Sequence, residues 1–240
     1  MAKIAIGYQC EKCKDLGYIL QEDEKGYTVA KPCECLEKRQ ILEKLKRCGL
    51  TDSFKKKTFS SFETDTEYQK QAKLQAMRYC KKFENEKGSF LLTGSPGTGK
   101  THLGIAIMIQ LVNQNVGCKY TEYISLIMSL KQCCMDVINY NKEMDKYKNC
   151  TVLFIDDLLK GQTSETDRKY IYEIINYRYM TEKSIIVSTE KTLDELMNYD
   201  AAIASRIIEM CKENIIEFKN VPNRRLQRLS LIHISEPTRP

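Results

Sequence analysis

The sequence predicts an α/β protein in which a parallel sheet is flanked by helices, with a small cysteine-rich module in front of it. Strand-like apolar runs alternate with helix-like segments from about Thr58 onward, which favours a parallel sheet with helices on both faces. A glycine-rich loop lies between one such strand and the helix after it, and a later strand ends in two aspartates. Two close cysteine pairs near the N-terminus indicate the separate module.

Each element is expected from its pattern of apolar and polar residues. An amphipathic helix and a linker are expected over residues 36–57, where an apolar stripe faces a basic surface. The expected strands are 88–93, 118–123, 151–155, 184–188 and 214–218. The expected helices are 67–84, 101–112, 125–140 and 164–180, with two more that begin at Leu193 and Ala201.

Residues 94–101 match G-x-x-x-x-G-K-[ST], the phosphate-binding P-loop, in the strand–loop–helix context that such a loop requires. The glycines let the backbone turn its N–H groups toward a polyphosphate, and the following helix directs its positive end at the same anion. Lys100 supplies a charge for the β- and γ-phosphates, and Thr101 supplies a hydroxyl for Mg²⁺. The expected nucleotide contacts in this segment are Gly94, Ser95, Pro96, Gly97, Thr98, Gly99, Lys100, Thr101 and His102.

Asp156 and Asp157 follow a run of residues that favour a buried strand. Ligands of open α/β sheets bind at the carboxyl ends of the strands, so Asp156 is expected beside the Mg²⁺ held by Thr101. Asp157 is expected to orient or deprotonate the attacking water. The alternative is a pair of solvated acids, which the upstream P-loop makes the weaker interpretation.

Composition limits the classes of function. The chain has 240 residues and a net charge of +6, which permits contact with nucleic acid without requiring it. No apolar run is long enough to span a membrane and no signal peptide is recognised, so a cytoplasmic protein without membrane association is expected. The 11 cysteines, an odd number, cannot all form disulfides within the chain, which is typical of a reducing compartment.

The four N-terminal cysteines have the spacing of a zinc site. Cys10 and Cys13 form one close pair, Cys33 and Cys35 form another, and a hairpin-sized interval separates them. Four thiolates can hold Zn²⁺ tetrahedrally and order a segment too small to build its own core. Incidental cysteines and a redox pair are the alternatives, and no βαβ pattern surrounds Cys10 and Cys13 to support the second.

The last twelve residues, 229–240, are unlike the rest of the chain. They resemble the translation of an adapter sequence used in sequencing libraries, and we treat them as a non-native tail.

Taken together, the motifs resemble those of the DnaC/IstB-type AAA+ ATPases, in particular phage and bacterial loaders of the replicative helicase. The segments that carry the resemblance are the cysteine pattern, 94–103, 155–158, 173–179 and 203–207. The resemblance implies that Arg206 is an arginine finger acting on the ATP of a neighbouring subunit. It also implies a sensor at Thr189, where the family usually has Asn, with Ser188 as the neighbouring alternative, and a C-terminal sensor at Arg225. AAA+ enzymes more often have Glu at the position of Asp157, and the chain resembles the variant group that has Asp there.

The function implied is that of an ATP-dependent helicase loader. ATP would be hydrolysed between the subunits of a homo-oligomeric ring or spiral, with Mg²⁺ bound. Residues 1–50 would form the zinc-binding module that grips the replicative helicase, and residues 51–228 would form an AAA+ domain that contacts single-stranded DNA. The alternatives are an IstB-type transposition helper and a non-catalytic adaptor that uses ATP as an assembly ligand.

Overall fold

The computed structural model describes residues 10–22, 26–50, 52–54 and 56–219, which form two compact units divided between Arg47 and Cys48. The expected sensor Arg225 and the tail at 229–240 lie outside the described residues. Among the helices described, none combines the length and the apolar character needed to cross a bilayer.

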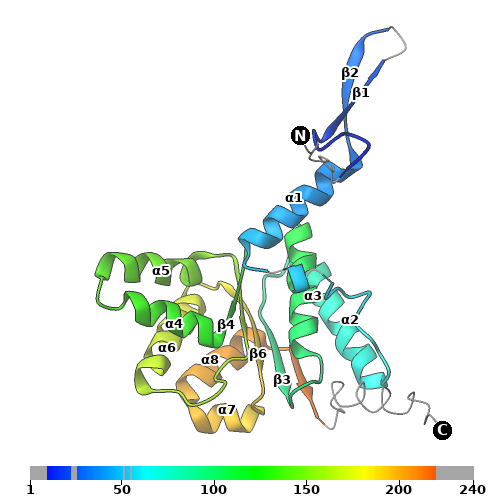
Figure 1. The fold of residues 1–240 in the computed structure, drawn as a ribbon. Helices are drawn as coiled ribbons and strands as arrows, with labels where there is room; N and C mark the ends of the chain where they lie inside the picture. Colours follow the sequence, from blue (N-terminus) through cyan, green and yellow to red (C-terminus); the bar gives the residue numbers. More distant parts are fainter. Residues whose placement is uncertain (1–9, 23–25, 51, 55, 220–240) are drawn as a thin grey trace, which may run out of the picture. The chain divides into compact units, whose positions relative to one another are not determined.

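The N-terminal unit consists of a β-hairpin and a helix (Figure 1). Strands β1 (Tyr18–Glu22) and β2 (Thr28–Pro32) pair antiparallel, and α1 (Glu34–Arg47) follows. The hairpin lies between the two cysteine pairs in sequence, so it returns the chain from the first pair to the second. A hydrogen bond of 2.8 Å from the backbone N–H of Cys33 to the carbonyl oxygen of Gly17 closes its base.

The second unit is built on a five-stranded sheet with all strands parallel. The strands are β3 (Phe90–Gly94), β4 (Cys118–Glu122), β5 (Val152–Asp156), β6 (Ser184–Thr189) and β7 (Ile215–Phe218). Their spatial order is β4-β5-β6-β3-β7, so β4 and β7 are the edges. Strands β3, β5 and β6 are buried along their whole length, as expected for strands covered on both faces.

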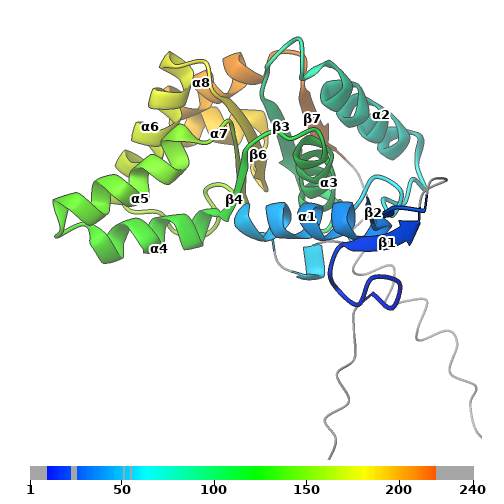
Figure 2. The ribbon, with the colours of Figure 1, turned by 90° about the horizontal axis from the view of Figure 1, so that it is seen from above.

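Helices cover both faces of this sheet, as Figure 2 shows. On one face α3 (Lys100–Asn113) packs across the central strands, and α2 (Glu67–Lys82) packs against α3. The other face carries α4 (Tyr123–Cys133), α5 (Val137–Asn149), α6 (Glu165–Met180), α7 (Leu193–Tyr199) and α8 (Ala201–Cys211). In this arrangement the start of α3 lies at the carboxyl ends of β3, β5 and β6, all on the same side of the sheet along the strand direction.

One of the expected elements is wrong in its extent. The single helix expected over 125–140 is two helices, because the chain breaks at Cys134 and Asp136 caps a new helix by accepting hydrogen bonds from the N–H groups of Ile138 and Asn139. The helix and linker expected over 36–57 are confirmed: α1 ends at Arg47, Gly49 follows with a positive φ of 88°, and the described residues from there to Lys57 include one short turn, η1 (Asp52–Phe54). The other elements differ from expectation by one or two residues at their ends.

Candidate functional site

The P-loop connects the end of β3 to the start of α3 and requires glycine at two of its positions. Gly94 and Gly99 have positive φ angles of 122° and 102°. A Cβ on Gly94 would lie 2.5 Å from the carbonyl oxygen of Phe218, and one on Gly99 would lie 3.0 Å from the ring of Phe62. Both the conformation and the space therefore exclude a side chain at these positions.

Lys100 directs its ammonium group back into the loop. Its Nζ donates to the carbonyl oxygens of Gly94 at 2.6 Å and Ser95 at 2.7 Å, and the residue is only 5% exposed. This burial lowers the pKa of Lys100. The hydroxyl of Thr98 donates to the same Ser95 carbonyl at 2.9 Å. The loop thus combines a buried amine with the N-terminus of a helix, an arrangement suited to a polyphosphate.

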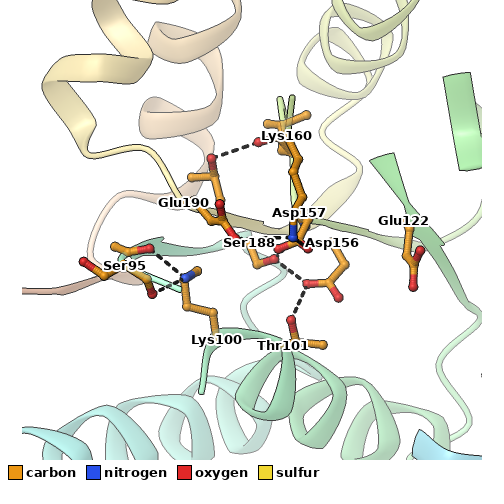
Figure 3. A network of polar contacts seen from close by, with 12 residues as sticks. Ser95, Lys100, Thr101, Glu122, Asp156, Asp157, Lys160, Ser188 and Glu190 are labelled. Atoms are coloured by element: carbon orange, nitrogen blue, oxygen red, sulfur yellow. Dashed lines mark hydrogen bonds and ion pairs between the residues drawn. The ribbon is translucent and has the colours of Figure 1, made fainter. Parts of the chain in front are cut away.

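Asp156, the last residue of β5, is the centre of a buried hydrogen-bond network (Figure 3). Its Oδ1 accepts hydrogen bonds from the Thr101 hydroxyl at 3.0 Å and from the Ser188 hydroxyl, and its Oδ2 accepts one from the Tyr120 hydroxyl at 3.2 Å. Burial raises the pKa of Asp156, and these donors counteract that shift by stabilising the carboxylate. The predicted magnesium pair, Thr101 and Asp156, is therefore in direct contact, and its oxygen atoms are the type of ligand that Mg²⁺ prefers.

Asp157 follows directly and makes different contacts. Its backbone has a positive φ of 55°, and its N–H donates to the Ser188 hydroxyl at 2.9 Å. Its Oδ2 forms an ion pair with Lys160 Nζ at 2.7 Å, and Lys160 also lies 3.3 Å from Oε1 of Glu190. The hydrogen bond to Asp157 raises the pKa of Lys160. A carboxylate that could orient water is thus held by a neighbouring cation.

A cavity of about 160 Å³ joins these groups. It is lined by Lys57, Pro96, Gly97, Gly99, Lys100, Thr101, His102, Asp157, Lys160 and Glu190. Most of the loop residues predicted to contact a nucleotide therefore border one hollow, together with the acidic end of β5.

His102 lines this cavity and also anchors the segment that precedes α2. Its Nε2 lies 3.0 Å from the carbonyl oxygen of Thr58 and 3.2 Å from the Ser61 hydroxyl. Its ring meets the ring of Phe62 edge-on, with 5.2 Å between the centroids. These contacts give His102 a role in holding residues 58–62 beside the loop.

The two sensor candidates on β6 point in different directions. Ser188 contacts both aspartates of β5, as described above. The hydroxyl of Thr189 instead donates to the carbonyl oxygen of Leu158 at 2.9 Å and is fully buried. Successive strand residues face opposite sides of the sheet, so the alternative, Ser188, is the one in contact with Asp156.

Arg206 lies on α8, where contacts within its own chain hold it against α6. Its Nε donates to Oδ1 of Asn176 at 2.9 Å, and its Nη1 donates to the carbonyl oxygen of Ala202 at 2.8 Å. The guanidinium lies over the rings of Tyr172 and Tyr179, 5.1 Å and 5.7 Å from their centroids. It is half-buried and does not line the cavity of its own chain, which a residue acting on a neighbouring subunit need not do.

The four N-terminal cysteines form a cluster in the described part of the first unit. The sulfur atoms of Cys10, Cys13, Cys33 and Cys35 all lie within 4.8 Å of one another. Four sulfurs at the corners of a zinc tetrahedron lie about 3.8 Å apart, so the cluster fits Zn²⁺. Burial opposes ionisation of Cys13, but hydrogen bonds from Cys35 and the Gly17 N–H lower its pKa to about 6, which favours the thiolate that a metal needs.

Three residues at the nucleotide site were not predicted from the sequence, namely Tyr120, Lys160 and Glu190, and a fourth, Ser188, was predicted only as an alternative. Ser188 and Glu190 lie at the end of β6, and Tyr120 lies near the end of β4. The rule that ligands bind at the carboxyl ends of parallel strands could have found these three. Lys160 lies on an irregular turn, and no comparable rule identifies such a residue from the sequence.

Comparisons with known proteins agree with this geometry. The profile of a family described as IstB-like ATP binding protein matches residues 26–229. The uncharacterized protein YqaM of Bacillus subtilis (strain 168) is 37% identical over 201 residues, which cover 79% of this chain and 63% of YqaM. XkdC, from the phage-like element PBSX of the same organism, is 32% identical over 228 residues, covering 90% of this chain and 84% of XkdC.

The replicative helicase loader DnaC of Escherichia coli (strain K12) is 22% identical over 151 residues, or 62% of each chain. This chain thus spans less than two thirds of the length of YqaM and of that DnaC. Among solved structures, a crystal structure of the DnaC helicase loader has a TM-score of 0.62 and 27% identity, covering 70% of this chain and 100% of that one. The structure of DnaI, with a TM-score of 0.59 and 24% identity over 73% of this chain and 94% of that one, shares the fold. These likenesses confirm the predicted α/β fold of AAA+ P-loop proteins.

Proposed function

The chain belongs to the family of IstB-like ATP binding proteins, and we propose that it is an ATP-dependent loader of the replicative DNA helicase. Membership confirms the resemblance found in the sequence and the predicted class of AAA+ ATPase. The observation that carries the proposal is the buried contact between Thr101 and Asp156 beside Lys100, in a chain that aligns with the full length of a DnaC helicase loader structure.

ATP and Mg²⁺ are the proposed ligands of the cavity at the P-loop. Lys100 would hold the β- and γ-phosphates, while Thr101 and Asp156 would hold the metal, which when bound neutralises charge on the phosphates. Asp157 would orient the attacking water. Arg206 would stabilise charge on the γ-phosphate bound by an adjacent subunit, which makes a homo-oligomer the active form.

The partners proposed are the replicative helicase and single-stranded DNA. The N-terminal module would bind the helicase, and the cysteine cluster supports a zinc-ordered surface for that purpose. The positive balance of the chain supports weak, sequence-independent binding of DNA that weakens steeply as salt increases. A cytoplasmic location, without membrane association, is part of the same proposal.

The decisive experiment combines purified chain with the purified hexameric helicase of the same genome. With ATP we expect a stable complex that transfers the helicase onto circular single-stranded DNA, measured by unwinding of an annealed strand. Lys100→Ala is expected to lose this transfer, and Lys142→Ala, an exposed lysine on α5, is the matched control. Unwinding that is the same with and without the chain would refute loading.

The family description favours one second candidate, a transposition helper of the IstB type. Such a helper would share the ATP site but would act on a transposase and its target DNA. Stimulation of a transposase encoded beside this chain, without any effect on the helicase, would decide for it. An adaptor without turnover would bind ATP and assemble, yet release no phosphate in the presence of helicase and DNA.

A further inference from the structure

The segment that follows α1 lies along the edge strand β4. The backbone N–H of Tyr120 donates to the carbonyl oxygen of Cys48 at 2.7 Å. Gly49, with its positive φ, packs so closely that a Cβ there would lie 3.0 Å from the carbonyl oxygen of Tyr120. The start of the segment is therefore fixed to the backbone of one particular residue of β4.

The same segment contacts the side chain of that residue. The ring of Phe54 meets the ring of Tyr120 edge-on, with 5.2 Å between the centroids, and Phe154 of β5 meets it from another side at 5.4 Å. Further along, the Lys57 ammonium lies 4.5 Å from the centroid of Phe54, and Lys57 also lines the nucleotide cavity. Of residues 48–57, those that the structure describes thus reach from the edge strand β4 to the phosphate site.

The other end of Tyr120 contacts the proposed magnesium site. Its hydroxyl donates to Oδ2 of Asp156 at 3.2 Å, whereas Thr101 and Ser188 donate to Oδ1. Tyr120 is 7% exposed, so its ring has little freedom to move independently of the residues around it. A displacement of Phe54 would therefore change the position of the hydroxyl relative to the carboxylate.

We propose that Tyr120 is a positioning residue that links the 48–57 segment to Asp156. The affinity of the nucleotide site for Mg²⁺ then depends on how Phe54 of this segment packs against Tyr120. The inference rests on the proposed ATP site and adds a route for its regulation. A partner or ligand that changes the position of Phe54 would act on Asp156 through the contact between Phe54 and Tyr120. Binding of the phosphates alone should change less, because the Tyr120 hydroxyl contacts Asp156, whereas the Lys100 ammonium is held within the loop itself.

The test measures how binding of a fluorescent ATP analogue to the full chain depends on the Mg²⁺ concentration. A second series measures how the rate of ATP hydrolysis depends on it. Tyr120→Phe keeps the ring but removes the hydroxyl, and we expect the half-saturating Mg²⁺ concentration to rise about 10-fold or more, the scale of one lost hydrogen bond to a carboxylate. Binding of the analogue without Mg²⁺ should change much less than the Mg²⁺ dependence does. Phe54→Leu should shift the Mg²⁺ dependence in the same direction.

The double variant, with Phe54→Leu and Tyr120→Phe together, shows whether the two residues act through one shared contact or independently. If Phe54 acts through the hydroxyl, Phe54→Leu should add little in the Tyr120→Phe background. Tyr140→Phe is the matched control for the hydroxyl, because it removes a similar hydrogen bond, 3.1 Å long, from Tyr140 of α5 to Glu173 of α6. Phe59→Leu is the control for the ring, since Phe59 borders a groove of α2 and α3.

The outcomes distinguish this inference from the proposed function. Unchanged Mg²⁺ dependence in Tyr120→Phe, or additive shifts in the double variant, would overturn the link while leaving the ATP site intact. A wild-type chain that binds no ATP analogue, or binds it without regard to Mg²⁺, would instead refute the ATP site and the link with it. Thermal unfolding of every variant shows whether a shift reflects a loss of fold.

Discussion

The hydroxyl of Ser188 on β6 donates a hydrogen bond to Oδ1 of Asp156 on β5. Ser188 also accepts a hydrogen bond of 2.9 Å from the backbone N–H of Asp157. One side chain therefore fixes both acidic residues that end the neighbouring strand. Thr189, the position suggested by the family pattern, contacts the carbonyl oxygen of Leu158 instead.

This difference predicts separate effects for the two residues. Ser188→Ala should lower the turnover number about tenfold, the effect of one lost hydrogen bond to a carboxylate, while ATP affinity changes little. Thr189→Val removes the donor to Leu158 and should cost about 1–3 kcal/mol of unfolding free energy. Phosphate release and urea unfolding measure the two effects. A loss of turnover in Thr189→Val, with none in Ser188→Ala, would contradict the assignment.

The P-loop and the acidic strand end predict different losses. Lys100→Ala should abolish nucleotide binding, since its ammonium is the buried charge of the loop. Asp157→Asn should keep binding but lower hydrolysis by about 100-fold or more, as expected when a group that orients or deprotonates water is lost. Equilibrium binding and single-turnover hydrolysis separate the two. Full turnover by Asp157→Asn would assign water activation elsewhere.

Substitution of Arg178 on α6 should lower the stability of the fold rather than change the chemistry of the nucleotide site. Its guanidinium is fully buried and donates to five carbonyl oxygens, those of Tyr147, Lys148, Cys150, Thr151 and Ser184. Arg178→Met would leave these acceptors without their donor and should lower the unfolding free energy by at least about 3 kcal/mol. Lys183→Met, which removes an exposed contact to Asn149, is the control and should change it by about 0.5 kcal/mol or less. Similar urea midpoints for both variants would contradict this account.

The cysteine cluster predicts one tightly held Zn²⁺ per chain. Elemental analysis of protein purified without chelator should find it, and Cys33→Ser should lose it. Cys134→Ser, which alters an exposed cysteine outside the cluster, should retain the metal. ATP binding should survive in Cys33→Ser, because the second unit has a hydrophobic core of its own. If helicase binding also survives, the module has a different partner.

The parts of the site that could be predicted are those whose functional residues lie close together in the sequence or at the end of a plainly apolar strand. Gly94, Gly99 and Lys100 belong to one loop, and Asp156 ends a strand whose apolar run is plain. Their contact with one another followed from a general rule for parallel sheets, since Thr101 and Asp156 meet at a shared edge. The order of the strands was not needed for that inference.

The parts that the sequence did not predict depend on how distant residues pack. Tyr120 reaches Asp156 from a strand 36 residues away, and nothing in either local pattern marks that contact. The ion pair of Lys160 with Asp157 depends on a turn in which Asp157 and Leu159 both have positive φ angles, which non-glycine residues rarely adopt. The break between α4 and α5 had a local signal, the capping residue Asp136, but the continuing apolar pattern concealed it.

The last prediction concerns Arg206 and the interface between subunits. In its own chain the guanidinium is held by Asn176 and lies over Tyr172, both on α6, and the residue is half-buried. The planar fork of an arginine can meet two phosphate oxygens at once, which suits it to a γ-phosphate bound by a neighbour. Arg206→Ala should therefore still bind ATP but hydrolyse it poorly when helicase and DNA are present. Arg168→Ala, which alters a half-buried arginine that lies over the ring of Tyr199, is the matched control.

Mixing two inactive variants tests whether Arg206 acts across the interface. In a mixed assembly, an Arg206→Ala chain contributes an intact P-loop, and a Lys100→Ala chain contributes an intact Arg206. Some interfaces then contain both functional groups, so hydrolysis should recover in the mixture although each variant alone is inactive. The recovery should depend on the ratio of the two chains and be largest when neither is in great excess. No recovery in mixtures shown to co-assemble would mean that Arg206 is structural, or that ATP is not bound between subunits.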